Sequence, residues 1–223
     1  MAREGDAPAT RLAGAPYAAA KPDAVSTNRL EAFSDGVIAV AITLLVLDLH
    51  VPTRAEGALG HQLLRQWPLY AAYVVSFITL GIIWINHHAM IGRLRSADRT
   101  ILALNLVLLM WIVLLPFATS MMAAYLKQPR GQHLAAALYS GSFLLMSITF
   151  LTLNGHILFP KSHLLGDEIP AERRRQIILR SSSGIGPYAV ATALAAVSAY
   201  VTLAICGAVA VFYALPIGSG GER

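Results

Sequence analysis

The apolar residues constrain the fold most, because they fall into long stretches separated by short polar segments. A helix that spans a bilayer needs about 20 predominantly apolar residues. Six segments fit this requirement: about 28–49, 67–91, 100–126, 133–154, 180–198 and 200–217. The sequence therefore predicts an all-α, polytopic membrane protein with six transmembrane helices. The last two segments meet near Ser198, so we expect them to form an antiparallel pair.

The composition supports a bilayer rather than a large soluble core. Of the 223 residues, 56% are hydrophobic and 13% are charged, whereas a soluble domain has about 25% charged residues. Cys206, the single cysteine, lies in an apolar run and predicts neither an intrachain disulfide nor a metal site. Residues 1–26 lack the apolar core of a signal peptide and predict a flexible cytoplasmic tail. The expected membrane domain is 27–217, followed by a second cytoplasmic tail at 218–223.

The basic residues predict an orientation. Thirteen of the 17 Lys and Arg residues fall in the N-terminal tail with Arg29, in loops 92–99 and 155–180, and at the C-terminus. Because cytoplasmic loops are enriched in Lys and Arg, this bias predicts a plasma-membrane protein with both termini in the cytoplasm. The net charge of +5 follows from these flanking residues and does not indicate nucleic-acid binding. The run Arg173–Arg175 predicts an amphipathic helix along the headgroups, before the fifth span.

The first apolar segment has two different faces. At about 100° per residue, one stripe of the helix centres on Val40, with Thr43 at its edge. Its other members are Arg29, Phe33, Gly36, Leu44 and Leu47. Ser34 and Asp35 lie on the back of the helix. An ionisable residue at this depth is costly unless it faces protein or water, so we expect partners for Asp35 on neighbouring helices. A simple helix cap at Ser34 or Asp35 is the alternative.

Candidate partners occur near the same end of the next two segments. They are Trp84, Asn86, His87, His88 and Asn105. Our hypothesis is that a buried hydrogen-bond network fixes the first helix against the second and third and so orients the apolar stripe.

The order Arg29-x-x-x-Phe33-Ser34-Asp35, followed by an apolar helix with Thr43, resembles the signature of the transmembrane protein 175 family of potassium channels. The resemblance extends over about residues 28–217. It implies a passive, potassium-selective or potassium-preferring channel whose only ligand is the permeant potassium ion, without a cofactor. It also implies a homotetramer with the first helix of each copy around a central pore. The motif occurs once and no internal repeat is evident, as in bacterial members of the family.

The resemblance also implies residue roles. Val40, Leu44 and Leu47 would form apolar rings around the pore, and Thr43 would supply hydroxyl groups for selectivity. Ordinary helix packing is the alternative for each of these side chains. Val40 is smaller than the Ile or Leu often found at its position, so we expect a wider inner constriction. The expected structural network comprises Arg29, Phe33, Ser34, Asp35, Trp84, His88 and Asn105.

Other functions fit the sequence less well. His87 and His88 point about 100° apart on a helix, and no Cys or carboxylate pattern accompanies them, so we predict no metal site. Sensing of pH by this pair stays open.

Asp48 could attract cations to the outer mouth or simply lie in a solvated helix end. A secondary transporter or proton/cation exchanger is the main alternative, although internal repeats are not evident. No catalytic pattern was found in the spans, so we do not expect an enzyme. A scaffold role stays open.

Overall fold

The computed structural model describes residues 26–51 and 59–215, and these residues form helices and no strand. The prediction of an all-α protein is therefore confirmed. Ser26 apart, the expected tails at 1–26 and 218–223 lie outside the described residues. The helices are α1 (Thr27–Leu44), η1 (Leu45–Asp48), α2 (Leu59–Arg65), α3 (Trp67–Ile91), α4 (Arg99–Tyr125), α5 (Gln132–Leu158), η2 (Ser162–Leu164), α6 (Ala171–Ser182), α7 (Ile185–Leu194) and α8 (Ala199–Ala214).

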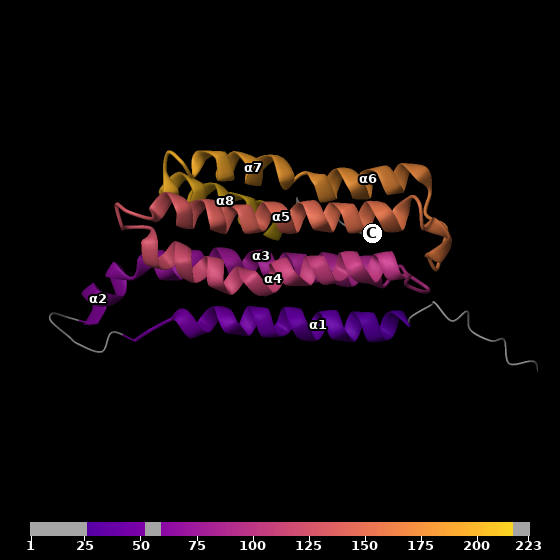
Figure 1. Cartoon of the computed structure of the whole chain (residues 1–223), viewed down its shortest axis with the longest axis horizontal. Coiled ribbons are helices and arrows are strands. Elements are labelled where there is room, and N and C mark those ends of the chain that lie inside the picture. The colour runs from indigo at the N-terminus through magenta and orange to yellow at the C-terminus, as the bar shows by residue number, and fades with distance from the viewer. Residues whose placement is uncertain (1–25, 52–58, 216–223) are drawn as a thin grey trace, which may run out of the picture.

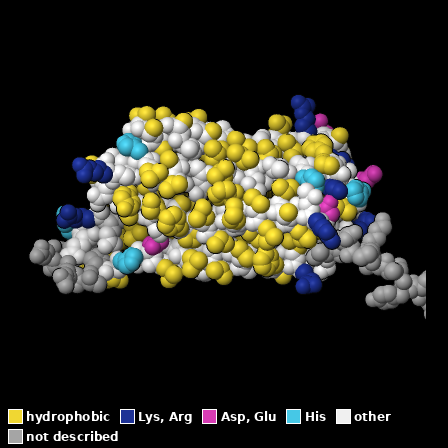
Figure 2. All heavy atoms as spheres, viewed as in Figure 1, with side chains coloured by type: hydrophobic (Ala, Val, Ile, Leu, Met, Phe, Trp, Pro, Cys, Tyr) yellow, Lys and Arg dark blue, Asp and Glu magenta, His cyan; other side chains and the backbone are white. Residues whose placement is uncertain are grey.

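Four of the helical segments are long and apolar enough to cross a membrane: α1 with η1, α3, α4 and α5. A fifth helix, α8, is apolar but shorter. On the face shown in Figure 2, hydrophobic side chains cover the middle of the molecule, and Lys and Arg gather at the two ends. This distribution matches a bilayer core between two polar boundaries.

The long helices run side by side along the longest axis of the molecule (Figure 1). α1 forms one outer layer, and it packs on α3 and α4. α4 packs most extensively on α5, and α6, α7 and α8 cover the other side of α5. Because α1 lies at the edge of the bundle, one side of this helix has no neighbour among the described residues.

Local sequence signals explain where several helices begin. The Asp98 carboxylate accepts a hydrogen bond from the Ile101 amide and caps α4, and the Ser198 hydroxyl accepts one from the Val201 amide and caps α8. Side chains of this kind satisfy amides that have no partner within the helix. Gly131, before α5, has φ 96°, and a Cβ there would lie 2.7 Å from the Tyr125 ring. The α4–α5 turn therefore requires glycine.

The region of the fifth predicted span differs from expectation. α5 continues to Leu158, and the segment that follows forms α6 and α7, which lie in line and are broken near Ser183 and Gly184. The basic helix predicted around Arg173–Arg175 exists, but it lies alongside α5, antiparallel to it, and packs on it. The prediction that it lies along the membrane surface is therefore wrong. The three consecutive arginines leave one apolar face on α6, and this face packs on α5. In a helix that lies on the membrane surface, the same face would contact lipid.

A polar cluster lies inside the central helices. The Ser76 hydroxyl is 2.8 Å from the Thr119 hydroxyl and 3.0 Å from the Tyr139 hydroxyl, so this cluster joins α3, α4 and α5. All three side chains are buried. Hydrogen bonds between membrane helices are worth about 0.6–2 kcal/mol each, so the cluster contributes to a rigid support for α1.

Candidate functional site

The two faces of α1 lie in different surroundings. Leu30, Ser34, Ile38 and Ala41 are buried, and they face the α3–α4 layer. Their four-residue and three-residue spacing is that of one helix face. The stripe centred on Val40 lies on the opposite side and is exposed.

The exposure of the stripe is high for apolar side chains. The exposed fraction is 57% for Val40, 38% for Leu44 and 68% for Leu47. Phe33 is exposed at 53%, and Arg29, Gly36 and Thr43 are exposed as well. The stripe is therefore a continuous outer surface of this single chain, free to contact lipid, another copy or a solvent-filled space.

Thr43 has a hydroxyl with a defined orientation. Its Oγ1 donates a hydrogen bond to the Val40 carbonyl at 2.8 Å. Because the proton is committed to the backbone, the remaining lone pairs of the oxygen are available as acceptors. An exposed oxygen of this kind can replace part of the hydration shell of a cation.

A buried hydrogen-bond chain holds the inner face of α1. The Ser34 hydroxyl donates to the Leu30 carbonyl at 2.9 Å, and the Asn105 amide donates to Ser34 Oγ at 3.0 Å. Asn105 Oδ1 therefore faces His87, whose Nε2 lies 2.7 Å away and must be the donor. His87 Nδ1 is buried without a partner among the described residues, which fits a neutral ring protonated on Nε2 alone, because a buried unpaired N–H is costly.

A second, more exposed layer of contacts joins α1 to α3. Trp84 Nε1 donates to Asp35 Oδ1 at 3.0 Å, and His88 Nδ1 lies 2.8 Å from Glu31 Oε1. The His88 side chain is 58% exposed, so its pairing with Glu31 adds little stability on its own. Both layers lie at the same end of α1 and fix its rotation relative to α3.

The structure brings together five of the seven residues expected in the network: Ser34, Asp35, Trp84, His88 and Asn105. Arg29 and Phe33 lie on the exposed face instead. His87, a candidate partner that is not one of the seven, also takes part, and so does Glu31, which the sequence analysis did not predict. Glu31 precedes Asp35 by four residues, a spacing that places both on one helix face, and this signal could have identified it. Asn86 points away, and its amide donates to the Ile82 carbonyl of its own helix.

One group of side chains could hold a metal ion. Ligand atoms of Glu31, Asp35 and His88 lie within 4.8 Å of one another. Part of this group already has partners within the chain, because Trp84 donates to Asp35 and Glu31 pairs with His88. Two carboxylates thus accompany His88, which the sequence pattern did not indicate, whereas His87 is turned toward Asn105.

The far end of α1 is also anchored. The helix tightens into η1, where the Ser120 hydroxyl of α4 donates to the Asp48 carboxylate. Asp48 is partly buried. The carboxylate is therefore attached to α4 at this end, and it is not a freely solvated helix terminus.

The arrangement defines a class of protein. The chain is a helical integral membrane protein in which an outer helix is fixed at both ends and presents an apolar stripe with one hydroxyl. Comparison with known proteins places it more narrowly. A family model described as the endosomal/lysosomal potassium channel TMEM175 matches residues 29–116. A potassium channel of Streptomyces collinus is 44% identical over 188 residues, which are 84% of this chain and 91% of that protein.

Further relatives agree. A potassium channel of Chamaesiphon minutus is 36% identical over 197 residues, 87% of this chain and 96% of that protein. The crystal structure of a lysosomal potassium-selective channel TMEM175 homolog from Chamaesiphon minutus superposes with a TM-score of 0.76 at 34% identity, covering 87% of this chain and 98% of that one. The human endosomal/lysosomal proton channel TMEM175 is 37% identical over 117 residues, 23% of its length. The chain belongs to the TMEM175 family and is of its single-repeat bacterial type.

Proposed function

We propose that this chain is one subunit of a passive, potassium-preferring channel whose conduction path is lined by the exposed stripe of α1. The observation that carries the proposal is this stripe, which is apolar, contains one oriented hydroxyl and belongs to a helix anchored at both ends. The bacterial relatives and the matching crystal structure are named as potassium channels, which supports the same function here.

One helix cannot enclose a pore, so the proposal requires several copies. We propose a homotetramer in which four α1 helices surround one axis, with rings of Val40, Leu44 and Leu47. Narrow apolar rings can gate by dewetting, and hydroxyl oxygens can replace water around a cation. Thr43 would supply these oxygens next to the rings. The permeant potassium ion would be the only ligand, and the reaction is transport, not enzymatic conversion.

The proposed topology has six spans in a bacterial plasma membrane. α1, α3, α4 and α5 account for four spans. α6 with α7 would form the fifth, and the short α8 the sixth. The end that carries Arg29, Arg99 and α6 would face the cytoplasm, because this end holds most of the Lys and Arg residues. Both termini would then be cytoplasmic.

The test is reconstitution of the purified full chain into liposomes under a potassium gradient. We expect unitary currents that reverse near the potassium equilibrium potential. The same vesicles under a proton gradient separate the alternatives, because the human relative is named a proton channel. Currents that follow the proton gradient alone would contradict potassium preference. Saturable flux without unitary currents would indicate the transporter considered from the sequence.

A further inference from the structure

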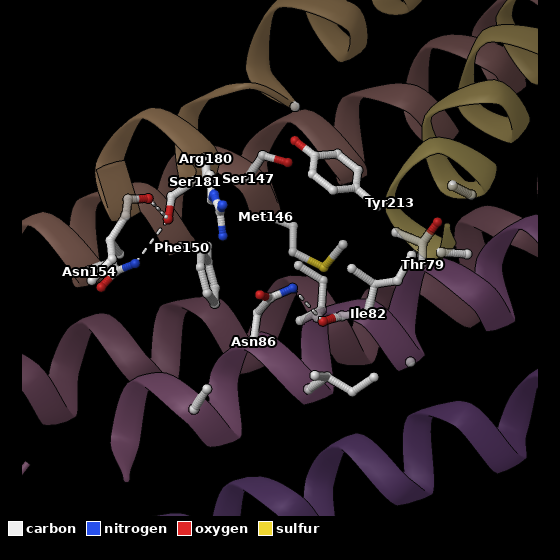
Figure 3. A pocket seen from close by; sticks show the side chains of 18 of the residues that line it. Thr79, Ile82, Asn86, Met146, Ser147, Phe150, Asn154, Arg180, Ser181 and Tyr213 are labelled. Carbon is white, nitrogen blue, oxygen red and sulfur yellow. Dashed lines mark hydrogen bonds between the residues drawn. The ribbon is translucent and has the colours of Figure 1, made fainter. Parts of the chain in front are cut away.

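A cavity lies on the side of the bundle away from α1. It is lined by residues of α3, α5, α6, α7 and α8 and has a volume of about 720 Å³. This volume is within the range of about 300–1,000 Å³ that is usual for small-molecule sites. Figure 3 shows its walls, with Ile82 and Asn86 from α3, Met146 and Phe150 from α5, and Arg180 from α6. The proposed ion path does not use this cavity.

The chemistry of the cavity is divided between apolar walls and cationic groups. Isoleucine, methionine and phenylalanine side chains line much of it, and Arg93, Arg173 and Arg180 also line it. No acidic side chain is among the described residues that line it. In Figure 3 the Arg180 guanidinium points into the cavity between Phe150 and Met146. A ligand that fits both parts has an anionic head and an apolar tail.

The arginines also interact with other groups of the chain. Each guanidinium carries five N–H donors in a fork that suits phosphate oxygens, so one arginine can serve a partner within the chain and a ligand together. Arg93 and Arg173 line a neighbouring hollow with Asp167 as well. Arg180 does not line that hollow, so it is the arginine best placed to serve a ligand in the cavity.

The apolar part of the cavity has open space beside a glycine of α3. Gly81 of α3 lines the cavity, and a Cβ built on it would meet no atom within 4 Å. A larger side chain at this position would therefore extend into open space beside the helix.

We propose that this cavity binds one anionic phospholipid, with its phosphate at Arg180 and Arg173 and an acyl chain along α3 beside Gly81. Basic pockets between membrane helices on the cytoplasmic side are typical sites for anionic headgroups. The basic end of this molecule is the proposed cytoplasmic end, where such lipids are concentrated. The proposal does not depend on whether the protein conducts ions.

Native mass spectrometry of the purified full chain tests the proposal. Phosphatidylglycerol and phosphatidylcholine with the same acyl chains are added in turn, and bound lipid is counted. We expect phosphatidylglycerol to bind at least about tenfold more tightly, because both lipids carry a phosphate but the cationic choline of phosphatidylcholine offsets its charge and is repelled by the arginines. Arg180→Ala should remove most of this preference. Arg175→Ala is the matched control, since Arg175 is exposed on the same helix and does not line the cavity.

Two more variants separate the lipid from other occupants. Gly81→Leu fills the apolar part of the cavity without changing its charge, and it should weaken phosphatidylglycerol binding about as much as Arg180→Ala does. If the Arg180→Ala protein does not elute as a folded species, Arg180→Gln is measured in its place. Inorganic phosphate is the second probe. Equal binding of both lipids, equal effects of Arg175→Ala and Arg180→Ala, or competition by inorganic phosphate as strong as by phosphatidylglycerol would overturn the proposal. Lipid binding that appears only after deletion of residues 216–223 would assign the cavity to the chain's own C-terminal residues and would also overturn it.

Discussion

The side chain of Asn105 joins three helices, because it donates to Ser34 of α1 and accepts from His87 of α3 while it belongs to α4. We expect Asn105→Ala to lower the free energy of unfolding by about 1–3 kcal/mol, since it leaves the buried His87 Nε2–H without an acceptor. Thermal unfolding of the purified protein measures this change. Asn86→Ala is the control, because Asn86 is exposed and bonds only to its own helix. Equal losses in both variants would contradict a special role for the buried chain.

Thr43 permits a test of selectivity at a single atom. Thr43→Ala removes the exposed hydroxyl and should lower the preference for potassium over sodium, with assembly unchanged. Thr43→Ser keeps the hydroxyl and should retain most of the preference. The measurement is the shift in reversal potential when potassium is replaced by sodium on one side of the bilayer. A permeability ratio in Thr43→Ala equal to that of the unchanged protein would remove Thr43 from the filter.

The sequence identified most of the residues around Ser34 but not their pairing. His87 and His88 are adjacent, and a rotation of α3 by one residue, about 100°, exchanges them. Only the packing of α3 on α1 and α4 decides that His87 is buried on Asn105 and that His88 meets Glu31. The exposed stripe could be predicted because it needs only helical periodicity within α1, whereas the partners lie about 50 to 70 residues away in the sequence.

At the level of elements, the start of α4 responds to pH. Partial burial of Asp98 opposes ionisation, but the hydrogen bond from the Ile101 amide and the ion pair with Lys161 outweigh it and lower the pKa of Asp98 from its usual 3.8. A group with a lowered pKa in the folded state stabilises the protein above its unfolded pKa, and this contribution is lost as the pH falls through the folded pKa. The loss therefore occurs below about pH 4.

We expect Asp98→Ala to cost about 1 kcal/mol at neutral pH because the helix cap is lost. Asp98→Asn should keep the cap, since Asn is also a good capping residue, while it removes the titrating group. The apparent unfolding temperature, followed from pH 6 to pH 3, should fall less steeply in Asp98→Asn than in the unchanged protein. Parallel curves would show that Asp98 contributes nothing to acid sensitivity.

The positions of the helices could be predicted where hydropathy alone decides. The predicted segment 67–91 coincides with α3, and 100–126 differs from α4 by one residue at each end. The position of α6 could not be predicted in this way, because its arginines lower the hydropathy while Ile177 and Ile178 pack against the core. The predicted span 180–198 also did not indicate that α6 ends at Ser182 and α7 begins at Ile185.

At the scale of the whole molecule, the exposed stripe of α1 predicts association. We expect light scattering of the purified protein, corrected for detergent, to give four chains per particle. Leu47→Asn places a polar group on the stripe and should leave the fold of each chain intact, because Leu47 is exposed. A monomer under conditions that preserve flux would contradict the proposed assembly.

The central claim is that the exposed face of α1 lines the ion path, and cysteine accessibility tests it most directly. Thr43→Cys and Leu47→Cys are compared with Val211→Cys, which is also exposed but lies on α8. The native Cys206 is buried and should not react. A water-soluble, positively charged thiol reagent should block potassium flux through the two α1 variants and leave Val211→Cys unaffected. Flux that persists in the modified α1 variants, or an equal block at Val211→Cys, would contradict the account.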